Sequence, residues 1–173
     1  MDKYLFRKIM KDEVIIMFEM ILERMRWMDF KGIKQWNVTD YANVYPLAYY
    51  EAKRLKDEVY VLENQINKQI VCAGVLMSED DRWDDDAPAL YLHNFVSVYN
   101  QEKLGYLFFK HVEALAKSLN KQFFRLDSAI DNEKLEQYYD TLGYQAVGRC
   151  VDGAYIGILR QKALINNESL NGE

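Results

Sequence analysis

Two adjacent tyrosines stand near the end of the segment NEKLEQYYDTLGY, which covers residues 132–144. Neighbouring residues on a helix point about 100° apart, so a protein core can accept at most one of Tyr138 and Tyr139. The other is either an aromatic residue of the surface or a phenol that faces something outside the core. A phenol with a pKa of about 10 keeps its proton at neutral pH and can donate it.

Acid–base chemistry has three further candidates in segments that read as strands. His93 would titrate near neutral pH, although a histidine that satisfies a local hydrogen bond in a sheet explains it equally well. Asp127 follows the apolar run FFRL, where a carboxylate is unusual, and it could instead hold a backbone or a side chain in place. Glu63 ends another such segment, VYVLE.

The composition is typical of one folded, soluble domain. The chain has 173 residues, of which 50% are hydrophobic and 14% aromatic, and its formal net charge is -5. It has no long basic run, so we expect no nucleic-acid partner. The longest apolar stretch, residues 14–22, contains Glu19 and is too short to span a bilayer, so we expect no membrane partner.

Two further features indicate the compartment. The first residues, MDKYLFRK, lack an apolar signal core, so we expect a cytoplasmic protein. Cys72 and Cys150 lie in apolar segments without a CxxC pattern or a neighbouring histidine. We therefore expect two buried, reduced thiols and no metal site.

The elements that must position these residues follow the order β-α-α-β-β-β-α-β-α-β-β. We expect strands on both sides of the turn Asp152-Gly153 and over residues 3–9, 59–63, 70–77, 90–98 and 122–129. We expect helices over residues 13–32, 46–58, 104–120 and 132–142. The strand–helix–strand passages 90–129 and 122–151 predict an α/β fold: a mixed α+β sheet of about seven strands with four helices.

The boundaries of the last helix and of the domain can also be predicted. Asp131 is a plausible N-cap, and Gly143 closes the other end, where a left-handed residue is needed. We expect a single domain over residues 1–163 and a polar tail over residues 164–173.

Three stretches, together with this order of elements, resemble the GNAT fold of the general-control-related N-acetyltransferases over nearly the whole chain. YLHNFVSV resembles the fourth strand of the family, NQEKLGYLFFKHVEALAK its cofactor loop and third helix, and RLDSAIDNEKLEQYYDTLGY its fifth strand and fourth helix. The last stretch is the most specific, because it matches a family pattern at Asn132, Leu135, Tyr139, Gly143 and Tyr144.

The resemblance implies acetyl-CoA as cosubstrate and a role for Tyr139. In the family the matching tyrosine donates a proton to the departing thiolate. A phenol can do so because its pKa of about 10 lies above that of a thiol, at about 8.5. Tyr138 would then pack inward with Leu135 and Leu142. The alternative is an amphipathic helix whose extra tyrosine is only a surface or core aromatic.

The resemblance also places the diphosphate of acetyl-CoA at the loop before residue 104. Aligning Gly105 with the second glycine of the family loop puts Lys103 at the first glycine. Asn100 then stands at the arginine or glutamine position, for which Gln101 could substitute. Backbone N–H groups at a helix N-terminus would bind the diphosphate, helped by the helix dipole. Lys103 lacks the freedom of glycine but adds a cation.

In the family the fourth and fifth strands splay apart, and the pantetheine arm inserts between them through backbone hydrogen bonds. A backbone N–H of the fourth strand polarises the thioester oxygen, and we expect pantetheine contact at Val96 or Val98. The implied catalytic residues are Tyr139, His93 and Asp127, although many members use a chain of waters instead of a single base. The implied cosubstrate-binding residues are Phe95, Val96, Ser97, Val98, Asn100, Gln101, Lys103, Leu104, Gly105, Tyr106, Asn132 and Tyr139.

Acceptor pockets of the family lie at the first two helices, the loop between them and the last hairpin. In this chain we expect Trp36 and Tyr41 to bind the acceptor, together with Trp83 in the acidic loop SEDDRWDDD. Aromatic rings beside carboxylates suit a cationic amine. Alternatively, the aromatic residues close the core over the helices, and the acidic loop is only solvated charge.

The resemblance therefore implies an N-acetyltransferase that moves an acetyl group from acetyl-CoA to a primary amine of a small molecule or peptide. No cysteine lies near the expected slot, so the transfer would be direct, in a ternary complex. Two other interpretations stay open: a module that binds acyl-CoA without robust activity, and an unrelated α/β interaction protein. The chain could be a monomer or a homodimer.

Overall fold

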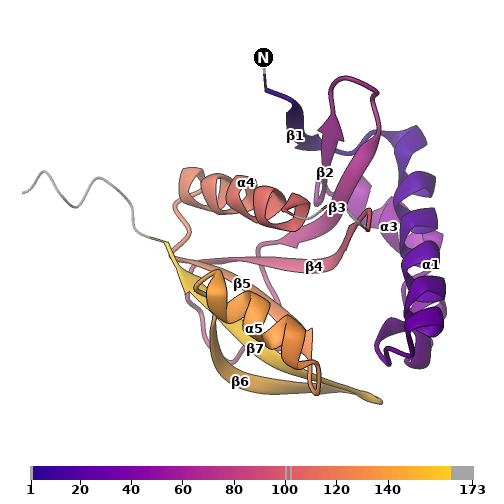
Figure 1. Cartoon of the computed structure of the whole chain (residues 1–173). Helices are drawn as coiled ribbons and strands as arrows, with labels where there is room; N and C mark the ends of the chain where they lie inside the picture. The colour runs from indigo at the N-terminus through magenta and orange to yellow at the C-terminus, as the bar shows by residue number, and fades with distance from the viewer. Residues whose placement is uncertain (1, 100, 102, 165–173) are drawn as a thin grey trace, which may run out of the picture. The chain divides into compact units, whose positions relative to one another are not determined.

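The computed structural model describes residues 2–99, 101 and 103–164 (Figure 1). The strands are β1 Tyr4–Lys8, β2 Val59–Asn64, β3 Ile70–Met77, β4 Ala89–Ser97, β5 Phe123–Ala129, β6 Gln145–Asp152 and β7 Tyr155–Ala163. The helices are α1 Val14–Lys31, α2 Tyr41–Val44, α3 Leu47–Leu55, α4 Leu104–Ser118 and α5 Glu133–Thr141. The predicted order is confirmed, with α2 as an additional single turn. From residue 165 on, the expected polar tail lies outside the described residues.

The strands form one mixed sheet in the order β1-β2-β3-β4-β5-β7-β6. β4 and β5 are parallel, with Ala89 opposite Phe123 and Tyr91 opposite Arg125, and α4 is the crossover between them. The pairs β1–β2, β2–β3, β5–β7 and β6–β7 are antiparallel. The predicted mixed sheet of seven strands is confirmed.

The chain divides into two compact units. Unit 1 contains the residues up to Leu76 together with His93–Phe108, and unit 2 contains Met77–Leu92 and the residues from Phe109 onward. β4 and α4 therefore contribute residues to both units. The single domain expected over residues 1–163 stays a prediction.

Unit 1 packs the helices α1 and α3 side by side (Figure 1). α1 turns one face inward, since its buried residues recur at helical spacing: Val14, Met17, Ile21 and Met28. β3 is buried from Ile70 to Leu76, which requires cover on both of its faces. These contacts give unit 1 an apolar core of its own.

Unit 2 contains β5, the hairpin β6–β7 and α5. In Figure 1, α5 crosses in front of β5 and β7. The core of unit 2 includes an aromatic cluster whose ring centroids lie 5.4 to 6.0 Å apart, formed by Phe109, Phe124, Tyr139 and Tyr144. Each of these rings is at most 8% exposed. The cluster joins α4, β5 and the end of α5.

α5 ends as predicted but begins differently. Gly143 follows the helix with a φ of 88°, the left-handed conformation that glycine adopts without steric cost. The expected cap at Asp131 is wrong: the side chain of Asn132 accepts the capping hydrogen bond, at 3.2 Å, from the N–H of Leu135. Asp131 instead lies in the preceding turn with a φ of 65°.

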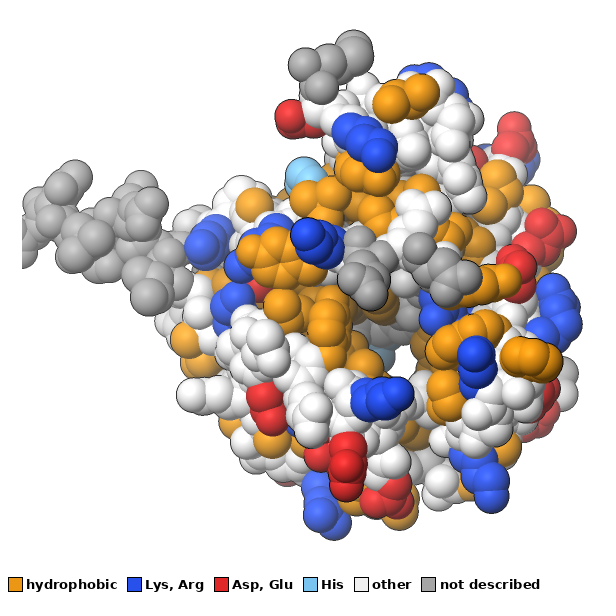
Figure 2. Space-filling model, in the orientation of Figure 1, with side chains coloured by type: hydrophobic (Ala, Val, Ile, Leu, Met, Phe, Trp, Pro, Cys, Tyr) orange, Lys and Arg blue, Asp and Glu red, His pale blue; other side chains and the backbone are white. Residues whose placement is uncertain are grey.

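Both cysteines are free and buried, as predicted. Within the described ranges, no helix combines the length and the apolar character needed to cross a membrane. Figure 2 shows that basic, acidic and hydrophobic side chains are all exposed on one face of the chain.

Candidate functional site

Asn94 interrupts the extended backbone of β4 within unit 1. Its φ of 54° lies in the left-handed region, which asparagine tolerates better than most residues. Its amide nitrogen donates to the Tyr41 hydroxyl at 2.5 Å, and its oxygen accepts from the Tyr49 hydroxyl at 3.1 Å. Because Asn94 is only 8% exposed, these two bonds hold the break in β4 from inside the unit.

The backbone at the end of β4 already has partners within unit 1. The N–H of Val98 donates to the carbonyl of Val71 at 2.9 Å. The carbonyl of Ser97 accepts a hydrogen bond from the guanidinium of Arg24 on α1. A pantetheine amide could therefore reach Val98 only through its carbonyl. The side chain of Val96 is buried, and the ring of Phe95 lies 5.1 Å from that of Phe108.

Lys103 occupies the loop position where the family has a glycine, and its φ is 77°. The loop therefore keeps a glycine-like backbone without a glycine. α4 begins at the next residue, and the first N–H groups of a helix have no intrahelical partner. Leu104 is buried, and its carbonyl accepts a hydrogen bond from the Cys72 thiol at 3.6 Å, which anchors this helix end.

The remaining predicted loop residues differ in exposure. Gln101 and Tyr106 are exposed and Gly105 is half-buried, whereas Asn100 lies outside the described residues. The described loop thus brings together an exposed cation, at Lys103, and a helix N-terminus, an arrangement that suits a phosphate.

An aromatic row in unit 1 contains two of the three residues expected to bind the acceptor. Trp36 stacks on Tyr41 with ring centroids 4.7 Å apart, and the row continues to Tyr45 and Tyr49 at 4.8 and 4.9 Å. Burial raises the pKa of the Tyr41 hydroxyl well above its usual value, so this hydroxyl is neutral. Since Tyr41 and Tyr49 both hold Asn94, the row and the break in β4 form one structure. His93 is the residue before Asn94 and is half-buried.

Tyr139 is the buried member of the tyrosine pair, within unit 2. It is 8% exposed, and its ring stacks on Phe109 at 6.0 Å with an interplanar angle of 18°. Its hydroxyl has no hydrogen-bond partner in the part of the chain that the structure describes. Burial raises the pKa of Tyr139, and Tyr138 and Asp127 act in the same direction, so the phenol is protonated at neutral pH.

Tyr138 does not pack inward as expected. It is 38% exposed, while Tyr139 fills the place beside Phe109 and Tyr144. The reason is tertiary: the orientation of α5 places Tyr139, and not Tyr138, against Phe109 of α4 and Tyr144 after α5.

Asn132 caps α5 with its side-chain oxygen, which leaves its amide nitrogen for another partner. No described residue accepts a hydrogen bond from that nitrogen. The residue is half-buried at the N-terminus of the helix. The amide could therefore donate to a cosubstrate while the oxygen keeps its structural bond.

Asp127 is held by two donors of unit 2. Its Oδ1 accepts from Arg82 at 3.1 Å, and its Oδ2 accepts from the Tyr155 hydroxyl at 2.6 Å. With both oxygens occupied, the carboxylate is poorly placed to take a proton from an amine. The contacts favour the alternative interpretation, in which Asp127 holds other side chains, and its role as a base stays a prediction.

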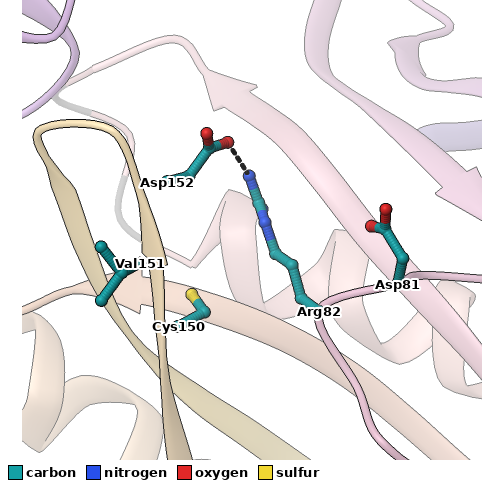
Figure 3. Close-up of a pocket in the computed structure, with 5 residues that line it drawn as sticks. All are labelled: Asp81, Arg82, Cys150, Val151 and Asp152. Carbon is teal, nitrogen blue, oxygen red and sulfur yellow. Dashed lines mark hydrogen bonds and ion pairs between the residues drawn. The ribbon is translucent and has the colours of Figure 1, made fainter.

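Arg82 also lines a pocket of about 380 Å³ at the β6–β7 hairpin (Figure 3). The other lining residues are Asp81, Cys150, Val151 and Asp152. Arg82 donates to Asp152 at 3.1 Å, as the dashed line in Figure 3 marks, so one guanidinium joins a strand residue, Asp127, to the hairpin. Burial raises the pKa of the Cys150 thiol, which makes it a weak nucleophile.

Trp83, the third expected acceptor residue, is engaged by an arginine of its own unit. The guanidinium carbon of Arg125 lies 4.1 Å from the ring centroid of Trp83, and two of its nitrogens bind Asp85 at 2.7 and 2.9 Å. The cation that this aromatic and acidic loop attracts is therefore supplied internally. A role for Trp83 in acceptor binding stays a prediction, and the contacts favour a structural role.

Glu63 is likewise occupied, within unit 1. Arg7 donates to its carboxylate at 2.5 Å, and this hydrogen bond lowers the pKa of Glu63. A carboxylate with a lowered pKa is a weaker base, so Glu63 is a poor candidate to accept a proton.

Sequence reasoning missed four residues that shape these sites: Arg24, Arg82, Tyr155 and Arg160. The roles of Arg24 and Arg82 could not be predicted, because a charged residue on a helix face or in a polar loop is expected to be solvated. The burial of Arg160 could have been predicted, since it follows the apolar run AYIGIL and so had to be buried or at an edge of the sheet. It is 2% exposed.

No family model matches the sequence, and no curated protein is significantly similar to it. The structure, in contrast, is similar to solved ones. An acetyltransferase of the GNAT family from Listeria monocytogenes 4b F2365 has a TM-score of 0.77 with this chain at 24% sequence identity. The match covers 93% of this chain and 95% of that chain. The chain has the GNAT fold.

Two further GNAT-fold structures contain coenzyme A or its acetyl form. The PaiA N-acetyltransferase from Thermoplasma acidophilum, in complex with coenzyme A, has a TM-score of 0.71 at 14% identity, over 94% of this chain and 99% of that chain. YncA from Salmonella typhimurium, with its cofactor acetyl-CoA, has a TM-score of 0.64 at 16% identity, over 96% of each chain. The fold predicted from the resemblance is thus confirmed along nearly the whole chain.

Proposed function

We propose that this GNAT-fold chain is an N-acetyltransferase that moves the acetyl group of acetyl-CoA to a primary amine of a small molecule or peptide. One observation carries the proposal. Tyr139 stands at the matching position of α5 with its ring fixed in an aromatic cluster and its hydroxyl without a partner among the described residues. The GNAT fold, and the coenzyme A and acetyl-CoA in two similar structures, support it.

The residues that we propose for the reaction belong to both units. In unit 1, Lys103 and the N-terminus of α4 would bind the diphosphate, and the backbone of β4 would bind pantetheine and polarise the thioester oxygen. In unit 2, the amide nitrogen of Asn132 would donate to the cosubstrate, and Tyr139 would protonate the sulfur.

The transfer would be direct, in a ternary complex. The amine nitrogen would attack the thioester carbon, so that a C–N bond forms and the C–S bond breaks. The amine would give its proton to His93 or to a water, and the coenzyme A thiolate would take its proton from Tyr139. Burial raises the pKa of both Cys72 and Cys150, so neither thiol is suited to form an acyl-enzyme.

The acceptor would meet the aromatic row of unit 1, at Trp36 and Tyr41. An aromatic ring attracts a cation through a face that no other ring covers, and the formal net charge of -5 attracts a cationic amine over longer distances. The proposal includes a cytoplasmic location and a monomer or homodimer, without a nucleic-acid or membrane partner.

Replacing Tyr139 by phenylalanine tests the proposed reaction. We expect Tyr139→Phe to lower the turnover number about 100-fold, because the thiolate would leave without a proton donor. Binding of acetyl-CoA should change little, since the ring remains in its cluster. Thiol release from acetyl-CoA, followed across a broad panel of amines, measures the first quantity, and calorimetric titration with acetyl-CoA the second.

Tyr138→Phe is the matched control, because it removes a phenol one residue away that is exposed. It should change turnover far less than Tyr139→Phe does, because the proton donor Tyr139 remains. Equal turnover in Tyr139→Phe and the wild-type chain would remove Tyr139 from the mechanism, and a wild-type chain that releases no thiol with any amine would refute the proposed activity.

Lys103 favours a second candidate function, a module that binds acyl-CoA without robust activity. A lysine in the place of the loop glycine changes the chemistry of the diphosphate site while keeping its backbone conformation. Acetyl-CoA would then raise the melting temperature, because a ligand that binds only the native state stabilises it, yet no amine would be acetylated. A melting temperature that does not respond to coenzyme A would exclude both candidates.

A further inference from the structure

Arg160 on β7 holds the last turn of α5 within unit 2. Its Nη1 donates to Oδ1 of Asp140 at 2.7 Å and to the backbone carbonyl of Tyr144 at 3.1 Å. Its guanidinium carbon lies 5.9 Å from the ring centroid of Tyr139. One buried cation thus spans the helix end from the residue after Tyr139 to the residue after Gly143.

Packing alone does not account for this arginine. Its Nε is buried and has no hydrogen-bond partner among the residues described, which costs free energy. The side chain of Asp140 is 65% exposed, so the ion pair returns little of that cost. An apolar side chain would fill the same space without burying a charge. The arrangement is explained if the cation has a task beside Tyr139.

We propose that Arg160 is a positioning residue for Tyr139: it fixes the end of α5 and supplies a positive charge beside the phenol as its proton leaves. This inference rests on the proposed function. When Tyr139 gives its proton to the coenzyme A sulfur, the O–H bond breaks, an S–H bond forms, and negative charge appears on the phenol oxygen. A cation next to the ring stabilises that charge.

The other groups around Tyr139 oppose this charge or are neutral to it. Asp127 on β5 and the neighbouring Tyr138 both raise the pKa of Tyr139, as does burial, and Arg160 acts in the opposite direction. Phe109 on α4 is apolar, and the pKa of Tyr144 is itself raised by burial and by Glu113. Among the described groups that act on the phenol, Arg160 is thus the one whose charge favours proton release.

A double-mutant cycle on turnover tests the proposal. Thiol release from acetyl-CoA is measured for Arg160→Met, Tyr139→Phe and the combined variant, with the amine that gives the fastest wild-type turnover. We expect Arg160→Met to lower kcat about tenfold in the wild-type background. In the Tyr139→Phe background it should lower kcat less than about twofold, because Arg160 acts through that phenol. KM for acetyl-CoA should stay within about twofold.

Three variants separate positioning from general destabilisation. Lys162→Met is the matched control, since it removes a β7 cation two residues away that pairs with Glu113 and faces the ring of Tyr144. It should lower the melting temperature without lowering kcat. Arg160→Lys keeps the charge and should restore part of the lost kcat. If Arg160→Met fails to fold, Asp140→Asn can replace it, because it weakens the ion pair that Arg160 makes with the exposed Asp140. Asp140→Asn should lower kcat less than Arg160→Met would, and it should not lower kcat further in a chain that already carries Tyr139→Phe.

Two contrary outcomes can be told apart. Losses of kcat that multiply in the combined variant, in an enzyme whose wild-type form turns over, would overturn the role of Arg160 and leave the proposed function standing. A wild-type chain that binds acetyl-CoA but releases no thiol would overturn both, because there would be no proton transfer for Arg160 to assist.

Discussion

Lys103 shows how one residue can keep the backbone of a site and change its chemistry. Its φ of 77° is a conformation that costs a residue with a side chain about 1 kcal/mol relative to glycine. In exchange, an exposed ammonium group stands beside the N-terminus of α4, where a phosphate would be bound. The strain and the charge can be separated, because glycine removes both and alanine removes only the charge.

We expect Lys103→Ala and Lys103→Gly to weaken acetyl-CoA binding about equally, by roughly three- to tenfold at low salt, because both lose the cation. Only Lys103→Gly should raise the melting temperature of the free protein, since it relieves the backbone strain. Titration calorimetry at two salt concentrations and thermal unfolding measure the two effects. Unchanged affinity in both variants would place the phosphate elsewhere.

At the scale of elements, β4 is a strand whose extended backbone is interrupted at one residue. Asn94 breaks its extended conformation, and hydroxyl groups from α2 and α3, at Tyr41 and Tyr49, hold the amide on both sides. The aromatic row that leads from Trp36 to Tyr49 is therefore tied to the conformation of the strand. α5 is built in a similar way, since a cap at Asn132 and a closing residue at Gly143 set its length.

Substitutions at Asn94 should separate its conformation from its hydrogen bonds. We expect Asn94→Ala to lower the free energy of unfolding by about 2–4 kcal/mol, because it adds left-handed strain to the loss of two hydrogen bonds. Asn94→Gly keeps the conformation and should cost about 1 kcal/mol less. Urea unfolding of the three proteins measures the difference. Equal stability of the alanine and glycine variants would mean that the left-handed backbone is not retained in solution.

At the scale of the whole molecule, the two compact units share elements. β4 passes from unit 2 at Leu92 to unit 1 at His93, and α4 passes from unit 1 at Phe108 to unit 2 at Phe109. Neither unit can unfold without disrupting a strand and a helix that the other also uses. Shared elements of this kind favour a single cooperative transition.

We therefore expect one unfolding transition for the chain. The tryptophans can report on each unit, because Trp27 and Trp36 belong to unit 1 and Trp83 to unit 2. Trp83→Phe leaves reporters in unit 1 only, and the double substitution of Trp27 and Trp36 by phenylalanine leaves one in unit 2. Urea midpoints measured by fluorescence should coincide with those from circular dichroism for each variant. Two separate midpoints would show that the units are independent domains.

The part of the site that could be predicted from the sequence is the part with a local cause. Gly143 was predicted from the needs of a helix end, whereas Asn132 and Tyr139 were recognised through the resemblance to the family pattern. The unusual position of Lys103 was also found from the sequence, because this lysine stands where the resemblance implies a glycine. The cap assigned to Asp131 was wrong by one residue, since either side chain could satisfy the first turn and only the backbone decides.

The residues that hold the side chains of the site in place could not be predicted, because they act through contacts between segments far apart in the sequence. Arg82 reaches Asp127 across 45 positions of the chain, and Arg125 reaches Asp85 across 40. Composition and spacing do not encode such pairs, because a charged residue in a loop has the same local signature whether it is solvated or paired. The candidate base Asp127 and the candidate acceptor residue Trp83 could be interpreted only once these partners were visible.

By itself, the sequence of this protein determined the order of its elements, the mixed sheet and the C-terminal end of α5, because hydrophobic periodicity and turn residues act over a few positions. Only the tertiary structure decided which tyrosine of the pair is buried and which cation stands beside it. Those choices depend on how α5 is oriented against Phe109 and Arg160, and that orientation follows from packing between segments far apart in the chain.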